Sequence, residues 1–340
     1  MDNNLPAGFG ARAITIEDIE ACVALMNAEA RWLNGKDMTN PEEMRSEWES
    51  PSFNMETDTM AVFSPANELV GLVEFWDWRP FHVRYHAYTT VHPNWLGRGI
   101  GRFLAGWLAR RGGLNVPQAP EGARVVLQQH INSQNQAACD LLANQGYRHI
   151  RDSYQMRIEF DAPPPAPVVP EGIVIRPTNG EEDRRKAMYT AYESFRDHWG
   201  AIDEPFEQYY TRWKDMVERS PDYDPSLWFV ALDGDTAAGV SICWPRFEED
   251  DQMGWVGTLG VRRPWRKRGL GLALLQVSFG EFYRRGKLRA GLGVDAASLT
   301  GAARLYERAG MRVWRLQHLF ELELRPGEEL TLQSLAAQAD

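Results

Sequence analysis

The sequence has no apolar stretch of the roughly 18–20 residues that a membrane-spanning helix needs. Its first residues, 1–6, lack the basic and apolar regions of a secretory signal. Cysteine is scarce: Cys22, Cys139 and Cys243 are far apart, lie in apolar surroundings and show no metal-ligand spacing. We therefore expect a cytoplasmic protein with buried, reduced thiols, no membrane partner and no metal site.

Positive charge is also in short supply. The chain has 37 Lys and Arg residues against 47 Asp and Glu residues, a net charge of -10. This balance argues against general nucleic-acid binding and is compatible with a cationic small-molecule substrate. The length of 340 residues and the ordinary hydrophobic fraction of 44% allow two domains, each with its own core.

A proline-rich segment, 161–172, divides the chain into two similar halves. Its five prolines favour extended backbone and disfavour both helix and sheet. The order of strand, turn and helix patterns before this segment recurs after it, and a repeat of this length indicates a duplicated domain. The sequence predicts an N-terminal domain at 1–160, a linker at 161–172, a C-terminal domain at 173–326 and a tail at 327–340.

Hydrophobic periodicity predicts the elements of each half. Thr15 is expected to cap a helix, with Asp18 completing a capping box. Strands are expected around 11–15, 60–63, 69–76, 86–91, 124–128 and 147–160, and again at 173–179, 227–232, 238–244, 254–261, 289–295 and 311–324. Helices are expected at 100–108, 134–144, 270–279 and 301–308.

Each half contains a glycine turn between a strand and a helix, at 91–101 and 261–271. The first N–H groups of a helix have no intrahelical partner, and the helix dipole adds partial positive charge, so such a turn attracts anions. Glycines allow a phosphate to approach the backbone. The second turn adds five cations, Arg262, Arg263, Arg266, Lys267 and Arg268.

Known phosphate-binding fingerprints do not match these turns. Leu104 and Leu274 occupy the place of the third glycine of a dinucleotide fingerprint, and no Gly-Lys-Ser/Thr follows either turn. Two alternatives stay open: a glycine turn that only packs a strand against a helix, and a nucleic-acid patch. The second is disfavoured because the cations gather at one turn.

The pattern Val261-x4-Arg266-x2-Gly269-x-Gly271 resembles the acetyl-CoA signature of the GCN5-related N-acetyltransferases, the GNAT family. The segment 302–311 resembles the second helix motif of that family, and 138–147 matches the same frame. With the segment 194–200, the arrangement is similar to tandem acetyltransferases of the mycothiol synthase kind. The resemblance implies an α/β (α+β) fold of two tandem GNAT-like domains, each a mixed, mostly antiparallel sheet flanked by helices.

The resemblance also implies roles for residues of the second half. Backbone amides of the turn would bind the pyrophosphate of acetyl-CoA, the co-substrate, and the preceding strand would hold the pantetheine arm. Tyr306 would protonate the leaving thiolate; the alternative is a tyrosine packed in the core. The implied cofactor-binding residues are Leu259, Gly260, Val261, Arg266, Lys267, Arg268, Gly269, Leu270, Gly271 and Leu272.

The first half departs from the family pattern. Leu96 stands in the position of Arg266, and Leu142 stands in the position of Tyr306. We therefore expect a catalytically degenerate domain, because it lacks the proton donor. A second cofactor site stays open there, at Val91, Arg98, Gly99, Ile100 and Gly101.

The general base is not assigned by the resemblance. Trp255 stands where many tandem relatives place a Glu, which leaves Glu249, Asp251 and His198 as candidates. The acidic run 248–251 is otherwise a solvated loop, or a feature that attracts a cationic amine. Most of the tryptophans near the acceptor side are expected in the core, and a subset could line the acceptor site: Trp76, Trp78, Trp199, Trp228, Trp244 and Trp255.

These observations predict transfer of acetyl from acetyl-CoA to a primary amine of a small molecule, by direct attack in the C-terminal domain. No activated cysteine or serine suggests a covalent intermediate. The alternatives are a CoA-binding sensor or scaffold without catalysis, and an enzyme that acetylates protein lysines or N-termini. The acceptor loops carry no motif that identifies the acceptor, and both a monomer and a homodimer remain open.

Overall fold

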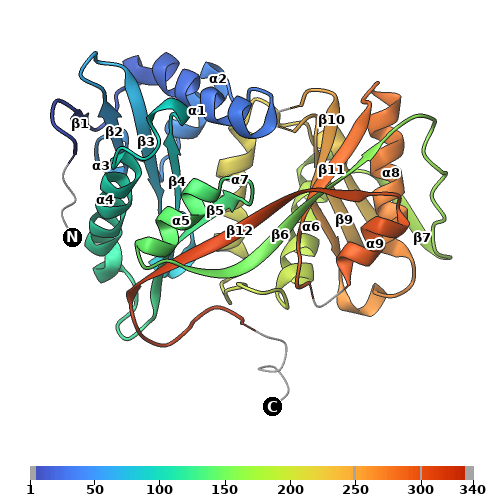
Figure 1. The fold of residues 1–340 in the computed structure, drawn as a ribbon. Helices are drawn as coiled ribbons and strands as arrows, with labels where there is room; N and C mark the ends of the chain where they lie inside the picture. The colour runs from blue at the N-terminus through green and yellow to red at the C-terminus, as the bar shows by residue number, and fades with distance from the viewer. Residues whose placement is uncertain (1–4, 248–249, 299–300, 334–340) are drawn as a thin grey trace. The chain divides into compact units, whose positions relative to one another are not determined.

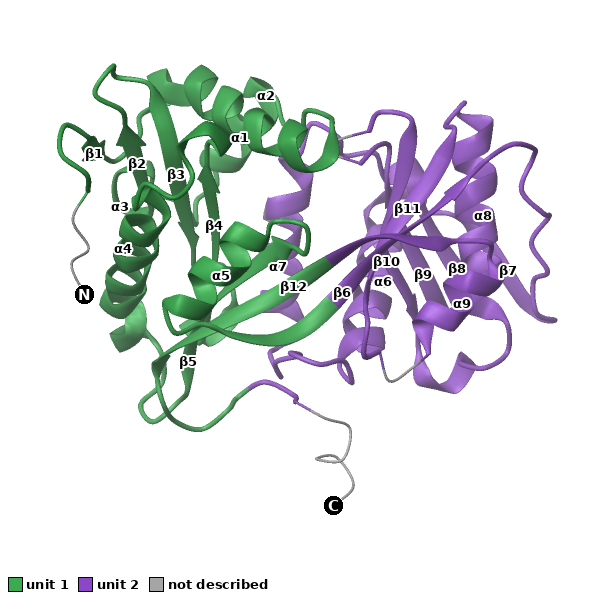
Figure 2. Cartoon of the chain, viewed as in Figure 1, with its two compact units in different colours: residues 1–152, 317–330 green, residues 153–316, 331–340 purple. Residues whose placement is uncertain are grey.

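The structure is a computed structural model that describes residues 5–247, 250–298 and 301–333. The chain folds into two compact units, coloured separately in Figure 2. Unit 1 comprises residues 1–152 and 317–330, and unit 2 comprises residues 153–316 and 331–340. Within the described residues, no helix combines the length and apolarity needed to cross a bilayer.

The elements of unit 1 are labelled in Figure 1. They are β1 (Gly10–Arg12), α1 (Ile19–Asn34), α2 (Pro41–Trp48), α3 (Met55–Asp58), β2 (Thr59–Phe63), β3 (Leu69–Trp76), β4 (Arg84–Val91), α4 (Ile100–Asn115), β5 (Val125–Asn132), α5 (Gln136–Asn144) and the start of β6 (Arg148–Glu159). Short 3-10 turns lie at Ile16–Asp18, Pro80–His82, Pro93–Trp95 and Val116–Gln118.

Unit 2 repeats this order. It contains β7 (Ile173–Pro177), α6 (Gly180–Phe195), α7 (Phe206–Glu218), β8 (Trp228–Asp233), β9 (Thr236–Trp244), β10 (Met253–Val261), α8 (Leu270–Arg284), β11 (Arg289–Asp295), α9 (Ala302–Arg308) and the start of β12 (Arg312–Arg325). Two 3-10 turns lie at Pro225–Leu227 and Arg263–Trp265. The proline-rich segment 161–172 forms neither helix nor strand.

Each unit is built on a mixed sheet with one parallel pair. In unit 1 the order is β1-β2-β3-β4-β5-β12, and in unit 2 it is β6-β11-β10-β9-β8-β7. Among the described strands of the two units, only β4 with β5 and β10 with β11 pair in parallel. The expected mixed, mostly antiparallel fold is confirmed, and so are the expected strands and helices. α4 and α8 extend beyond their expected ends at 108 and 279, to Asn115 and Arg284.

The sixth strand of each sheet comes from the other half of the sequence. Residues 317–325 of β12 pair antiparallel with β5 in unit 1. Residues 153–159 of β6 pair antiparallel with β11 in unit 2. The two halves therefore exchange their last strands.

Helices pack on both faces of the sheet in unit 1. Because successive strand residues point to opposite faces, neighbouring residues of β3 contact helices on different sides. On one face, a Cβ at Gly71 would lie 2.6 Å from Ile100 of α4. On the other face, Leu72 packs in one cluster with Ile19 and Cys22 of α1. In unit 2 the same alternation places Gly239 against α8 and Val240 against α6.

Two local expectations are also confirmed. The carboxylate of Asp18 accepts a hydrogen bond from the backbone N–H of Thr15 at 2.8 Å, as in a capping box. All three cysteines are buried and unpaired. Burial raises the pKa of Cys243 to about 11, so this thiol stays protonated at neutral pH.

Candidate active site

The glycine turn of unit 2 connects β10 to the first residues of α8. Gly269, with φ of 87°, is the N-cap of α8, and Lys267 has φ of 62°. Left-handed backbone is uncommon for a residue with a side chain, so the strain at Lys267 indicates that the turn's shape is imposed. The turn leaves the first N–H groups of a 15-residue helix without intrahelical partners. It has the geometry of an anion site.

The turn of unit 1 has the same backbone conformation. Gly99, with φ of 86°, caps α4, and Gly97, with φ of 75°, stands in the place of Lys267. Ile100 is buried at the start of α4, and the guanidinium of Arg98 lies 4.4 Å from the ring of Trp95. Both units therefore keep the turn, but only the second places a cation at its left-handed position.

The second glycine of each turn has a packing role. A Cβ at Gly101 would lie 2.6 Å from a methyl of Leu141, and a Cβ at Gly271 would lie 3.2 Å from a methyl of Leu305. These leucines belong to α5 and α9, so small residues let the two helices of each unit approach closely. Glycine is therefore needed for close packing at positions 101 and 271, as one alternative predicted. At positions 99 and 269 glycine is needed because the backbone has a positive φ.

Arg266 does not extend toward solvent but anchors the turn. Its guanidinium contacts the carboxylate of Asp197 at 2.5 and 3.1 Å, and donates to the carbonyls of Val261 and Ser194, both at 2.9 Å. Asp197 has only 5% of its side chain exposed. Arg263 adds a third contact to this carboxylate at 3.1 Å.

The remaining cations of the turn divide into two groups. Arg262 donates to the carbonyl of Ala237, and its guanidinium lies 5.7 Å from the ring centre of Tyr189 and 5.4 Å from that of Trp265. Lys267 and Arg268 are exposed, and their side chains form no ion pair or hydrogen bond with any described residue. Of the five cations, these two are available to an anionic ligand.

Asp197 also contacts the imidazole of His198. Its carboxylate lies 3.2 Å from Nδ1 of His198, whose ring packs 4.5 Å from that of Phe195. Burial lowers the pKa of His198 below 6.5, although Asp197 opposes the shift. The imidazole is therefore largely neutral at pH 7, as a general base must be.

β10 and β11 separate beside the turn. Their parallel pairing covers Met253–Val256 and Arg289–Leu292 and then ends, although both strands continue. A β-bulge between Val256 and Thr258 interrupts the register of β10 with β9. A side chain at position 257 would force Trp244 to move, because a Cβ there would lie 2.6 Å from Nε1 of Trp244. The separation leaves an edge of β10 toward which an extended ligand can lie.

The predicted pantetheine-binding residues lie on this part of β10. Leu259 is partly buried between two hydrophobic clusters. Gly260 lies against Ser194 at the end of α6, where a Cβ would come within 2.9 Å of the serine. The carbonyl of Val261 already accepts from Arg266. At the start of α8, Leu270 is buried and Leu272 is partly exposed.

Tyr306 lies on α9 and is 7% exposed. Its ring belongs to the core cluster of unit 2, together with Leu292 and Val294 of β11. Burial raises its pKa to about 12, and its hydroxyl has no hydrogen-bond partner among the described residues. The ring of Tyr306 is therefore packed in the core, as the alternative to a catalytic role predicted. Its hydroxyl is nevertheless protonated and lies beside β11.

The counterpart in unit 1 lacks this hydroxyl, since Leu142 of α5 is buried in the same frame. The pairing of β4 with β5 also ends early, at His86 and Gln128, while β4 continues to Val91. β3 and β4 pair in a continuous register from Gly71 to Trp76. Unit 1 thus has the separated strands but neither the bulge nor the tyrosine.

Sequence reasoning missed one titratable group of unit 1. Glu29 of α1 accepts a hydrogen bond from Nδ2 of Asn135, the N-cap of α5, at 3.3 Å. Burial raises the pKa of Glu29 to about 7, and hydrogen bonds from Thr90 and Asn135 oppose the shift. A single glutamate within a helix carries no motif, so only its surroundings mark it.

The other candidate bases are less well placed. Asp251 precedes β10, whose nine residues span roughly 30 Å, so it lies at the far end of that strand from the turn. Its side chain is 80% exposed. Asp250 pairs with Arg289, and Glu248 and Glu249 lie outside the described residues.

The tryptophans divide between core and partly exposed positions. Trp255 stacks on Phe247 at 4.3 Å, and its ring covers the backbone of Gly291. Trp76 and Trp228 are buried in their cores. Three others are only partly buried: Trp78, Trp199 and Trp244.

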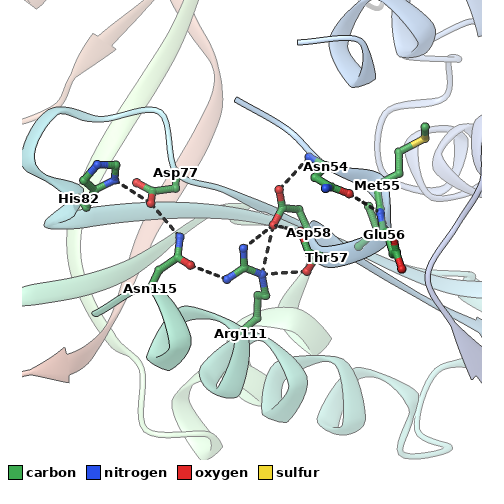
Figure 3. A network of polar contacts seen from close by, with 10 residues as sticks. Asn54, Met55, Glu56, Thr57, Asp58, Asp77, His82, Arg111 and Asn115 are labelled. Carbon is green, nitrogen blue, oxygen red and sulfur yellow. Dashed lines mark hydrogen bonds and ion pairs between the residues drawn. The ribbon is translucent and has the colours of Figure 1, made fainter. Parts of the chain in front are cut away.

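Unit 1 also contains a cavity of about 720 Å³ that sequence reasoning did not anticipate. A chain of polar contacts runs along its wall (Figure 3). Asp77 accepts from His82 and from Asn115, and Arg111 joins Asn115 to Asp58 with contacts of 2.6 Å at both ends. The cavity lies at the C-terminal end of α4, whose 16 residues place it roughly 24 Å from the glycine turn.

Comparisons with known proteins agree with this geometry. Residues 188–311 match the family model described as the acetyltransferase (GNAT) family. A mycothiol acetyltransferase from Streptomyces scabiei (strain 87.22) is 29% identical over 264 residues, covering 77% of this chain and 79% of that protein.

Solved structures extend the similarity to both units. A GCN5-related N-acetyltransferase from Sphaerobacter thermophilus is 35% identical, with a TM-score of 0.80 and coverage of 96% of this chain and 99% of that chain. A tandem GNAT protein from the clavulanic acid biosynthesis pathway is 14% identical, with a TM-score of 0.70 and coverage of 94% and 100%. The second similarity shows a shared fold.

Proposed function

The chain belongs to the GNAT family of N-acetyltransferases, whose acetyl donor is acetyl-CoA, and from this premise we propose that unit 2 acetylates a primary amine of a small molecule. One contrast carries the assignment to unit 2. Both units keep the glycine turn, but only unit 2 adds a tyrosine at position 306 beside the separated strands, where unit 1 has Leu142. The name of the mycothiol acetyltransferase relatives supports a small-molecule acceptor.

The residues of the turn fit the diphosphate of acetyl-CoA. The N–H groups at the start of α8 are unpaired within the helix and carry the positive end of its dipole. The exposed cations Lys267 and Arg268 add charge at the same place. The backbone of β10 beyond the bulge would hold the pantetheine arm and orient the thioester carbonyl.

The reaction follows from the protonation states. The neutral amine of the acceptor attacks the thioester carbonyl, forming the N–C bond and breaking the C–S bond. Tyr306, with a pKa of about 12, is protonated at neutral pH and donates its proton to the leaving thiolate. The amine loses its excess proton to a base, for which His198 is our candidate.

Matched glycine variants test which unit performs the transfer. Gly99 and Gly269 have φ values of 86° and 87°, and a Cβ at either position would meet no atom within 4 Å. Valine therefore adds similar backbone strain at both sites, about 1–3 kcal/mol, and its Cβ meets no atom at either. We expect Gly269→Val to raise the KM for acetyl-CoA at least about tenfold, and Gly99→Val to leave it nearly unchanged.

Steady-state kinetics with a panel of amino sugars, polyamines, amino acids and peptides measures this contrast. If Gly99→Val impairs turnover as strongly as Gly269→Val while both variants stay folded, unit 2 is not the site of transfer. If the wild-type chain binds acetyl-CoA by calorimetry but no amine releases CoA thiol, the sensor alternative replaces the enzyme proposal.

The base assignment predicts a pH dependence. Because the neutral imidazole is the active form, kcat/KM calculated for the neutral form of the acceptor amine should be constant at neutral pH. It should fall as pH drops through the pKa of His198, which lies below 6.5. We expect His198→Asn to lower kcat/KM by about a hundredfold and to remove this acidic limb. A pH profile of the variant with the same acidic limb as wild type would show that another group is the base.

A further inference from the structure

Three metal-ligating side chains meet in unit 1, and none of them is among the residues assigned to acetyl transfer. His149 and Asp152 belong to β6, and His318 belongs to β12. Oδ1 of Asp152 lies 2.6 Å from Nε2 of His149 and 2.7 Å from Nδ1 of His318. The ligand atoms of these three side chains all lie within 4.8 Å of one another. Among the described residues, no other set of three or more His, Cys, Asp or Glu side chains does so.

Strand pairing and packing hold the two rings in place. The first residues of β6, up to Asp152, belong to unit 1, where β6 and β12 are hydrogen-bonded neighbours although the two histidines are far apart in sequence. The imidazole rings lie 4.6 Å apart at an angle of 70°. The ring of Phe320, which is buried, lies 5.6 Å from His149 and 6.4 Å from His318. One side of the group is thus closed by an apolar ring.

The other side of the group is open to solvent. The side chains of His149, Asp152 and His318 are 43%, 36% and 23% exposed. An ion can therefore enter without unfolding the strands, and a water molecule can complete its coordination. Two imidazoles, one carboxylate and a water form a ligand set that suits zinc and other borderline divalent transition metals, and suits Mg²⁺ or Ca²⁺ poorly.

We propose that His149, Asp152 and His318 bind one divalent transition-metal ion, with Zn²⁺ as the reference ligand. Metal–ligand bonds of about 2.0–2.2 Å place neighbouring ligand atoms roughly 3.3 Å apart, so the present contacts of 2.6 and 2.7 Å open by roughly 0.6–0.7 Å. Each imidazole offers the lone pair of the nitrogen that now faces Asp152, and its ring hydrogen resides on the other nitrogen. This departs from the absence of a metal site expected from the sequence.

The bound ion would tie β6 to the strand that the other half of the chain contributes to unit 1. Because the ligands converge only when β12 is paired in this sheet, the ion binds the folded state and not the unfolded chain. The expected consequence is a metal-dependent gain in thermal stability that is independent of acetyl-CoA.

The test uses the full, untagged chain, stripped of metal with a chelator that is then removed. Calorimetric titration with ZnCl₂ should show one equivalent bound in the micromolar range or tighter, and Zn²⁺ should raise the melting temperature. His149→Gln keeps a donor for Asp152 but removes the metal ligand, so it should weaken binding at least about tenfold and abolish the thermal shift. His149 is exposed enough for this variant to fold.

A matched control separates this group from an ordinary His–Asp pair. His82 contacts Asp77 at 2.9 Å and has no second histidine beside it among the described residues. His82→Gln should therefore bind Zn²⁺ as wild type does. The proposal is overturned if the wild-type chain binds no stoichiometric Zn²⁺, or if His149→Gln and His82→Gln bind it equally.

Discussion

Replacing Tyr306 with phenylalanine should lower kcat by about 10²–10⁴-fold while leaving acetyl-CoA affinity nearly unchanged. The ring is buried beside Leu292 and Val294, and phenylalanine keeps that packing. The hydroxyl has no hydrogen-bond partner among the described residues, so its removal leaves no other buried polar group unsatisfied. The loss should therefore appear in the chemical step and not in stability.

The leaving group provides the sharpest check of this role. An acetyl thioester of a more acidic thiol needs less proton donation, so Tyr306→Phe should impair its turnover less than that of acetyl-CoA. Tyr283→Phe is the control, because this tyrosine of α8 is 37% exposed and lies outside the proposed site. Unchanged turnover in Tyr306→Phe, or an equal loss with both thioesters, would contradict the acid role.

Replacing Arg266 with leucine should destabilise unit 2 by about 3 kcal/mol, at the lower end of the range for breaking a buried ion pair. The variant leaves the carboxylate of Asp197 buried. Its remaining partners are Arg263, which is 60% exposed, and His198. Leucine is the residue that unit 1 has at this position, so its volume suits the turn. Urea unfolding followed by a probe in unit 2 measures the change.

Arg268→Leu is the matched control for this prediction. Arg268 lies in the same turn, but it is exposed and forms no ion pair with a described residue. Its loss should change stability by less than about 0.5 kcal/mol and weaken acetyl-CoA binding. Equal stability losses in the two variants would contradict the anchoring role of Arg266.

Acid pH should reduce the difference between wild type and Arg266→Leu. Burial is the largest single influence and opposes ionisation of Asp197, but the hydrogen bonds and charge of Arg266, together with Arg263 and His198, outweigh it. They lower the pKa of Asp197 to about 2, against an ordinary value of 3.8. A lowered carboxyl pKa adds stability above pH 3.8, and this contribution is lost as pH falls toward 2. The gap in unfolding free energy should therefore narrow over that interval.

The sequence by itself determined the fold class, the order of most elements and the two glycine turns. β10, β11 and α9 lie within a residue or two of their expected bounds, because hydrophobic period and glycine placement are local properties of the chain. Helices α2, α6 and α7 were not anticipated. The sequence also showed that Leu142 replaces the tyrosine, which identifies the half expected to be inactive.

Only the tertiary structure decided which side chains meet. A strand's pattern shows that one face is buried but not which strand pairs with it, so the exchange of β6 and β12 between the units left no trace in the periodicity. For the same reason, His149 and His318 could not be linked from the sequence. The sequence shows Arg266 as one of five cations at the turn, whereas the structure shows that Asp197 neutralises it. Charge is a local property of the sequence, but ion pairing depends on the fold.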